Sequence, residues 1–257
     1  MRTYLRVRGA HADEIAGEVV REKPLTIYVN SEKFLTLLCS PLDLEALVVG
    51  YLWMEKIIGG LDEIRHLEVS PVDGRAEVTL AHPVTLPTER ILTSGCGGGI
   101  TFRIDHRLFP RLSSTLRVRP DALVQGMKGL FAAALHYKAS RGIHGAALSD
   151  GERLLLVAED VGRHNAVDKI KGAALLRGIP TEGRILFSTG RVSSEMLLKA
   201  ARMGVPLIAS RTSPTEMAVA LAEQLNITVC GYVRTDGFNL YAGNGLLLGE
   251  EVAAPRG

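Results

Sequence analysis

The residue best suited to covalent chemistry is Cys96, which stands in the run Gly95-Cys96-Gly97-Gly98-Gly99. Glycine has no Cβ, so this run lets the backbone turn tightly and lets another molecule approach the sulfur closely. A cysteine in a core usually has apolar sequence neighbours, and Cys96 has none nearby. We therefore predict a reactive thiol at Cys96. Cys39 and Cys230 lie at the end of one apolar segment and inside another, which favours small core side chains.

The densest polar stretch, residues 159–165, combines Asp160, Arg163, His164 and Asn165 between an apolar segment and a predicted helix. One Asp or Asn is enough to cap a helix, so the additional charged side chains favour a functional role. His144 stands alone in Gly142-Ile143-His144-Gly145, and a structural and a functional interpretation fit it equally well.

Three loops carry residue types that are typical of anion or nucleotide sites. Ser188-Thr189-Gly190-Arg191 joins a strand to a helix, where hydroxyls and free amides bind phosphate and Arg191 adds a charged fork. It lacks the Gly-Lys-Ser/Thr ending of a Walker loop, and an ordinary capped turn explains it as well. Residues 210–214 share this ambiguity. Residues 232–237 place an aromatic ring, a cation and an acid at a strand-end turn.

Hairpins and one helix are predicted in the first third of the chain. Segments 25–29 and 34–38 alternate around Asn30-Ser31-Glu32, and segments 65–70 and 76–80 are joined through Asp73-Gly74. Between the hairpins, Ser40-Pro41-Leu42-Asp43 is typical of a helix start, with Ser40 as the N-cap. This helix is expected to end near Ile58, before Gly59-Gly60.

The second half of the chain is predicted to alternate between helices and strands. Helices are predicted over 121–139, 165–177, 193–203 and 214–224, and strands over 145–148, 153–158, 184–188, 205–210, 227–233 and 238–241. This alternation predicts an α/β fold with a largely parallel sheet. Ligands of such sheets lie beyond the carboxyl ends of the strands, so loops 188–191, 210–214 and 234–237 are expected at the binding edge.

Composition narrows the class of protein. The 257 residues carry 30 Lys and Arg against 28 Asp and Glu, a net charge of +2 that does not suggest nucleic-acid binding. Three widely separated cysteines argue against a disulfide framework and cannot form a four-thiolate zinc site. Met1–Arg21 has no apolar stretch typical of a signal peptide, and no segment approaches the length of a membrane span. We expect a soluble, cytoplasmic protein.

Several segments together resemble one family, that of the formate dehydrogenase accessory sulfurtransferases, the FdhD family. The segments that carry the resemblance are Ser40–Glu45 with Gly50-Tyr51, Gly142–Leu148, Gly162–Ala166 with Asp168-Lys169, Ser188–Arg191, Met196–Gly204, Leu221–Glu223 and Gly231–Arg234. The resemblance extends over nearly the whole chain. The resemblance implies a β-rich N-terminal region with one helix over residues 1–103, ending in the Cys96 loop. Residues 104–257 would form a cytidine-deaminase-like three-layer α/β/α domain, in a homodimer.

The resemblance also implies a reaction. Family members receive sulfane sulfur from a cysteine desulfurase and pass it to the bis-molybdopterin guanine dinucleotide molybdenum cofactor of formate dehydrogenase. Their carrier is the first cysteine of a Cys-x-x-Cys loop, which corresponds to Cys96. The second cysteine is replaced by Gly99, so a two-cysteine relay is absent here, although a persulfide needs only one thiolate.

The cofactor-binding segment implied by the resemblance consists of Tyr232, Val233, Arg234, Thr235, Asp236 and Gly237. A guanine nucleotide such as GDP would occupy the same site. Ser188, Arg191 and His164, with Arg163 as an alternative, are candidates for phosphate contacts. Zinc deaminases need a His- or Cys-x-Glu together with a later Pro-Cys-x-x-Cys. No zinc is expected, because this chain has no Cys-x-x-Cys and His144 is followed by Gly145-Ala146 rather than by x-Glu.

Two alternatives stay open at this point. One is a cofactor-binding chaperone of formate dehydrogenase that needs no carrier cysteine. The other is a hydrolase in which Cys96, His164 and Asp160 act as nucleophile, base and orienting acid.

Overall fold

The computed structural model describes residues 2–86, 91–92, 100–101 and 109–243. Its N-terminal part contains a four-stranded sheet in the order β4-β3-β6-β5, formed by β3 (Lys23–Val29), β4 (Glu32–Cys39), β5 (Ile64–Ser70) and β6 (Arg75–Leu80). Both predicted hairpins are confirmed. Helix α1 (Leu44–Met54) and a short 3-10 turn (Leu61–Glu63) connect them, and apolar residues of α1 share one core with the sheet.

The predicted start and end of the first helix were wrong. Helix α1 begins at Leu44 after Asp43, whose backbone is left-handed (φ 47°) and whose side chain makes no capping hydrogen bond. The hydroxyl of Ser40, the predicted N-cap, instead accepts a hydrogen bond of 3.0 Å from the backbone N–H of Val161. The helix ends at Met54 rather than near Ile58. A contact distant in sequence therefore displaced the local cap.

The larger part is built on a six-stranded sheet with the order β10-β9-β11-β12-β13-β14. Its strands are β9 (His144–Ser149), β10 (Leu154–Asp160), β11 (Ile185–Ser188), β12 (Leu207–Ser210), β13 (Thr228–Arg234) and β14 (Gly237–Ala242). Only the pairs β11–β12 and β12–β13 are parallel. The prediction of a largely parallel sheet was therefore wrong, because a hairpin strand lies at each flank of this short parallel centre.

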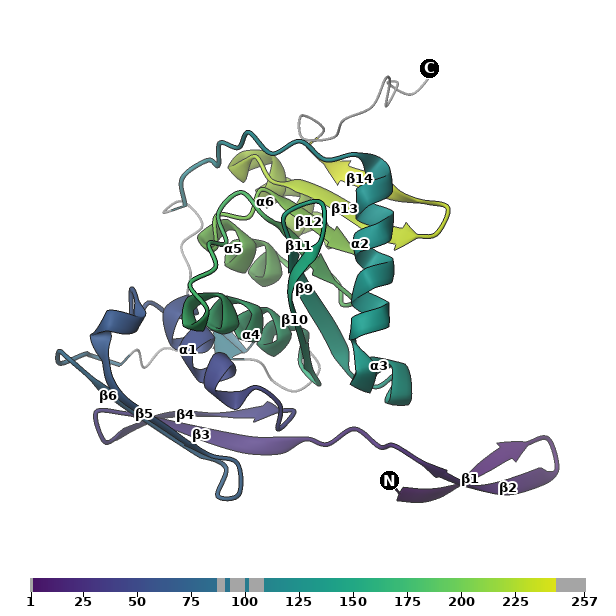
Figure 1. Cartoon of the computed structure of the whole chain (residues 1–257), viewed down its shortest axis with the longest axis horizontal. Helices are drawn as coiled ribbons and strands as arrows, with labels where there is room; N and C mark the ends of the chain where they lie inside the picture. The colour runs from purple at the N-terminus through teal and green to yellow at the C-terminus, as the bar shows by residue number, and fades with distance from the viewer. Residues whose placement is uncertain (1, 87–90, 93–99, 102–108, 244–257) are drawn as a thin grey trace.

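Helices cover both faces of this sheet (Figure 1). Helix α2 (Pro120–Ala133) packs on the face that carries Ile185 and Phe187 of β11. Helices α4 (Arg163–Leu176), α5 (Ser194–Arg202) and α6 (Glu216–Leu225) pack on the opposite face, which carries Leu186. Successive side chains of a strand point to opposite faces of the sheet, so alternate residues of β11 pack into the cores on its two sides. The result is a mixed α/β fold with a helix–sheet–helix arrangement.

The helix predicted over 121–139 is broken into two, α2 and α3 (Leu135–Ser140). The carboxylate of Glu159 accepts hydrogen bonds from the backbone N–H groups of His136 (3.1 Å) and Tyr137 (2.6 Å). An acidic side chain at this position satisfies the free amides of a helix start, so Glu159 caps α3 as a separate helix.

The two parts meet through a close crossing of α1 and α4. A Cβ added at Gly50 of α1 would overlap the carbonyl group of Asp168, and one added at Gly172 of α4 would overlap the carbonyl group of Ala46. Only glycine allows the two helix backbones to approach this closely. This crossing fixes the N-terminal sheet against the larger part.

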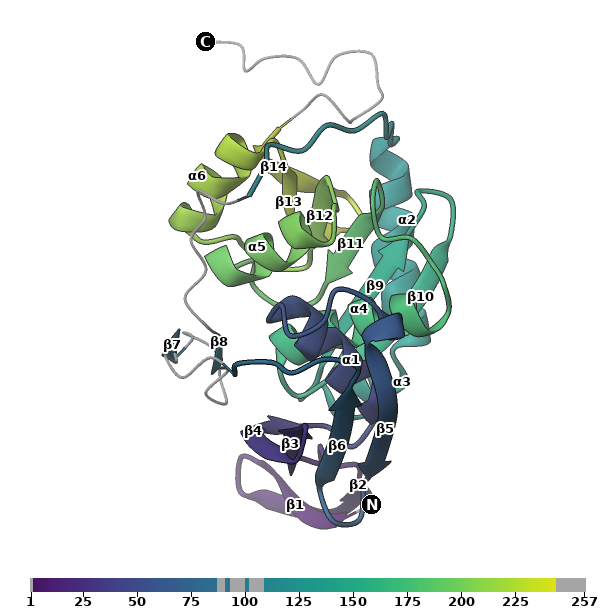
Figure 2. The ribbon, with the colours of Figure 1, turned by 90° about the vertical axis from the view of Figure 1, so that its left-hand side faces the viewer.

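Two further hairpins lie outside both sheets. Strands β1 (Arg2–Arg8) and β2 (His11–Gly17) pair only with each other and extend away from the body of the molecule (Figure 1). Strands β7 (Ile91–Leu92) and β8 (Ile100–Thr101) form a short antiparallel pair, visible in Figure 2 apart from the main sheets.

Candidate functional site

Hydrogen bonds join the loops beyond the parallel strands into a continuous row. The Ser210 hydroxyl donates to the carbonyl of Gly190 (2.8 Å) and accepts from the N–H of Thr212 (3.1 Å). The N–H of Tyr232 in turn donates to the carbonyl of Thr212 (3.1 Å). The expected binding edge is therefore assembled from loops 188–191 and 210–214 and the beginning of 232–237. Within it, the Ser188 side chain is buried and accepts from the N–H of Gly190, whereas Arg191 is exposed.

At one end of this row, His164 lies between the starts of α4 and α5. Its Nε2 lies 3.1 Å from a carboxylate oxygen of Glu195 and 3.4 Å from the hydroxyl of Ser193, the N-cap of α5. Burial lowers the pKa of His164, and the hydrogen bond from His164 lowers the pKa of Glu195. The two directions correspond to a neutral imidazole beside an ionised Glu195 at neutral pH.

His144 belongs to the same end of the row. Its Nδ1 lies 3.4 Å from the hydroxyl of Thr189, and the position of a Cβ on Gly190 would be 3.2 Å from that nitrogen and 2.9 Å from Cβ of Arg163. Burial, followed by the positive charge of Arg163, lowers the pKa of His144. Two neutral histidines and an arginine thus gather where loop 188–191 meets the start of α4. The glycine at position 190 is what gives them room.

The opposite end of the row is the turn between β13 and β14. Tyr232 is 39% exposed and has a left-handed backbone (φ 52°), at an irregularity in the pairing of the two strands. Tyr232, Arg234, Asp236 and Gly237 line an open depression of about 560 Å³ together with Phe238 and Asn239. Val233 is fully buried and belongs to the core instead. The hollow offers a ring for stacking, a cation and a carboxylate, the groups that bind a nucleotide base and phosphate.

Cys96 lies outside the described residues, in the segment between β7 and β8. The other two cysteines are described and both are buried free thiols. Burial raises the pKa of Cys39 to about 12 and that of Cys230 to about 12. Because the thiolate is the nucleophile in sulfur exchange, neither is suited to that chemistry at neutral pH.

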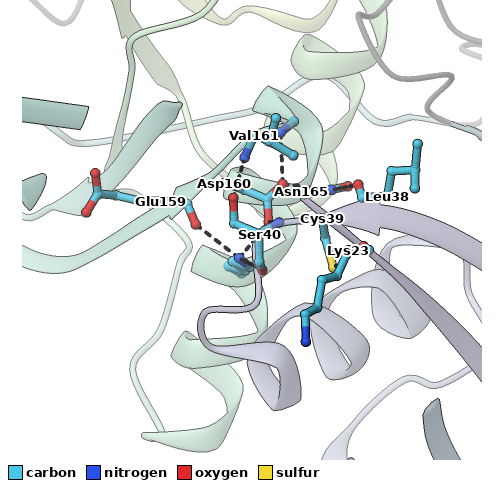
Figure 3. Close-up of polar contacts among 10 residues, drawn as sticks. Lys23, Leu38, Cys39, Ser40, Glu159, Asp160, Val161 and Asn165 are labelled. Atoms are coloured by element: carbon cyan, nitrogen blue, oxygen red, sulfur yellow. Dashed lines mark hydrogen bonds and ion pairs between the residues drawn. The ribbon is translucent and has the colours of Figure 1, made fainter. Parts of the chain in front are cut away.

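The polar stretch 159–165 mainly joins the two parts of the protein (Figure 3). The buried carboxylate of Asp160 lies 2.6 Å from Nζ of Lys169 and accepts hydrogen bonds from the N–H groups of Ser40 (3.1 Å) and Gly162 (2.8 Å). Asn165 donates to the same carboxylate (2.9 Å) and to the carbonyl of Leu38 (2.9 Å). Residues of the N-terminal sheet are thereby tied to the start of α4.

These contacts correct the proposed hydrolase triad. Asp160 is held by Lys169 and by backbone N–H groups, and the carboxylate that pairs with His164 is Glu195. Sequence reasoning missed Glu195. Its position in the first turn of a predicted helix, directly after Ser193-Ser194, was the available signal.

In the described part of the chain, no three His, Cys, Asp or Glu side chains gather as metal ligands would. The expected absence of zinc stays a prediction. None of the described helices combines the length and apolar character that a bilayer crossing requires.

Comparison with known proteins identifies the family. A family model described as the FdhD/NarQ family matches residues 20–247. The chain belongs to the FdhD/NarQ family. Relatives within it are named sulfur carrier protein FdhD. The one from Bacillus subtilis is 38% identical over 247 residues, covering 94% of each chain, and the one from Bacillus pumilus is 41% identical over 230 residues, covering 87% and 88%.

A solved structure extends the family likeness to the fold. The structure, described as that of a formate dehydrogenase accessory protein from Desulfotalea psychrophila, superposes with a TM-score of 0.80 at 29% identity. It covers 96% of this chain and 98% of its own. The family resemblance noted from the sequence is therefore confirmed.

Proposed function

We propose that this FdhD/NarQ protein is a sulfur carrier that serves formate dehydrogenase, with Cys96 as the carrier. The observation that supports Cys96 most directly is the state of the other cysteines. Cys39 and Cys230 are buried and have pKa values raised to about 12, so the chain has one remaining thiol for the task. Its glycine neighbours give a donor and an acceptor close access to the sulfur.

The first half of the reaction is a thiol–persulfide exchange. The Cys96 thiolate attacks the outer sulfur of a persulfide on a cysteine desulfurase. A new S–S bond forms at Cys96, the bond within the desulfurase persulfide breaks, and the desulfurase cysteine leaves as a thiolate. One thiolate is sufficient, so Gly99 in place of a second cysteine does not prevent this step.

The acceptor in this proposal is the bis-molybdopterin guanine dinucleotide molybdenum cofactor, bound as a substrate along the row of loops. Its guanine end would stack on Tyr232 and contact Arg234 and Asp236 in the open depression. Its phosphates would lie toward loop 188–191, near Arg191 and His164. The hydrogen-bonded row from Gly190 to Tyr232 supports this placement, because it holds both ends in a fixed relation.

Further parts of the proposal follow from the family. The larger part of the chain is assigned a cytidine-deaminase-like fold, and the active unit is assigned as a cytoplasmic homodimer. A cofactor-binding chaperone without a carrier thiol is the competing function. The depression beside Tyr232 fits both functions, and only the sulfur-carrier function requires Cys96.

A complementation experiment separates the two. Cells that lack their own family member are supplied with the wild type, with Cys96→Ala, or with Cys39→Ala as a matched control at a buried cysteine. Formate dehydrogenase activity returns with the wild type and Cys39→Ala and is absent with Cys96→Ala. Full activity with Cys96→Ala, at equal protein level, would refute the carrier role and favour the chaperone.

A further inference from the structure

Arg211 lies in the middle of the row of loops, and hydrogen bonds fix the backbone around it. Its N–H donates to the carbonyl of Ser188 (2.9 Å), and the carbonyl of the next residue, Thr212, accepts from the N–H of Tyr232 (3.1 Å). Strand β12, which leads into this loop, pairs with β11 on one side and with β13 on the other. Neighbouring strands lie about 4.8 Å apart, so Arg211 stands roughly one strand spacing from loop 188–191 and one from Tyr232.

The guanidinium group of Arg211 has no hydrogen-bond or ion-pair partner among the residues that the structure describes. Its Nη1 is buried without an acceptor, while the residue as a whole is half-exposed. The ring of Phe131 on α2 lies 6.0 Å from Cζ, a contact that orients the group and leaves its donors unused. Buried donors in proteins are nearly always paired, because an unpaired one costs free energy. A guanidinium held in this way is suited to an anion that comes from outside the chain.

Two other arginines differ from Arg211 in burial or in position. Arg191 is exposed, so its long side chain loses rotamer freedom when it binds a ligand. Arg184 also has a buried N–H group without an acceptor, at Nε, but it directly precedes β11 and therefore lies at the opposite edge of the sheet. Arg211 combines a partly buried charge with a place on the binding edge.

We propose that Arg211 binds the diphosphate of the guanine nucleotide portion of the cofactor, an inference that rests on the proposed function. With the base on Tyr232, the phosphates extend along the row toward loop 188–191 and meet Arg211 on the way. The planar fork of a guanidinium matches two phosphate oxygens, and charge-assisted hydrogen bonds of this kind are stronger than neutral ones. Arg211 would thus make the site select a nucleoside diphosphate over the corresponding nucleoside.

Calorimetry with GDP and guanosine tests this assignment, because the two ligands differ only in the phosphates. Arg211→Met keeps most of the side-chain length and removes the charge, so the Kd for GDP should rise by about tenfold or more while the Kd for guanosine stays within about twofold. Arg184→Met is the matched control and should leave both affinities unchanged. Tyr232→Ala should show a different pattern and weaken both ligands, since it removes the ring beneath the base.

A conservative variant separates loss of the phosphate contact from loss of folding. Arg211→Lys retains the charge without the fork, and it should recover part of the GDP affinity that Arg211→Met loses. The proposal is overturned if the wild type binds guanosine as tightly as GDP, if Arg211→Met binds GDP like the wild type, or if it loses both ligands equally. A wild type that binds neither ligand would instead refute the nucleotide site of the proposed function, and the role of Arg211 with it.

Discussion

Replacing Lys169 with methionine tests whether the buried charge pair holds the two parts of the protein together. Lys169 is fully buried, and its three N–H donors are all used: one toward Asp160 (2.6 Å), one to the carbonyl of Ser40 (3.2 Å) and one to that of Glu159 (3.0 Å). Methionine preserves most of the volume and removes all three donors. It leaves a buried carboxylate without its cation and two carbonyls without a partner.

Removing one partner of a buried ion pair costs about 3–5 kcal/mol. For a chain of this size that loss corresponds to a decrease in Tm of roughly 6–20 °C. Lys171→Met is the matched control on the same helix, because Lys171 is also buried and its amino group meets a hydroxyl, that of Thr181 (3.3 Å), and the ring of Trp53. We expect that variant to lose about 1 kcal/mol.

Urea unfolding of four proteins completes the test: the wild type, Lys169→Met, Asp160→Asn and the double variant. Because the two side chains interact directly, the double variant should be more stable than the sum of the single losses implies, by about 0.5–3 kcal/mol. If Lys169→Met costs no more than Lys171→Met, or if the single losses simply add, the account of this contact is wrong.

Three other outcomes are expected. Gly172→Ala should lower the free energy of unfolding by about 3 kcal/mol or more in urea, because the added methyl group would overlap a carbonyl of α1. In the control Gly129→Ala on α2, the methyl group meets only a flexible side chain at 3.2 Å, so the free energy of unfolding should change by about 1 kcal/mol or less. Because folding lowers the pKa of His164, the unfolded chain takes up the proton first, and the free energy of unfolding should fall as pH drops below about 6.5. His164→Gln should reduce this fall when denaturation is measured as a function of pH. An unchanged pH profile would contradict the lowered pKa of His164. Tyr232→Ala and Asp236→Asn should each weaken GDP binding by about tenfold in calorimetry, and wild-type affinity in both would remove the depression as the nucleotide site.

Local sequence signals were sufficient for most elements of the fold. The hairpin around Asn30-Ser31-Glu32 and the one at Asp73-Gly74 follow from turn residues placed between alternating strands. Helix α5 begins at its Ser193 cap, as its sequence indicates. Strand order was not predictable in this way, since periodicity does not say that β9 pairs antiparallel with β11.

Errors arose where a residue serves a partner far away in the chain. Ser40 looks like a helix cap, yet its hydroxyl is used by Val161. Asp160 looks like the orienting acid of His164, yet its carboxylate is fixed by Lys169, and Glu195 takes the place beside the histidine. The assignment of residues 232–237 to cofactor binding came from family resemblance rather than from spacing, and Val233 within that segment is buried in the core.

Intact-mass measurement tests most directly whether Cys96 alone carries sulfur. The protein is incubated with a cysteine desulfurase and cysteine, without reductant, and weighed. We predict that the wild type and the double variant Cys39→Ala/Cys230→Ala each gain the mass of one sulfur atom, and that Cys96→Ala gains none. A sulfur adduct that persists in Cys96→Ala, or its absence from the wild type, would contradict the account.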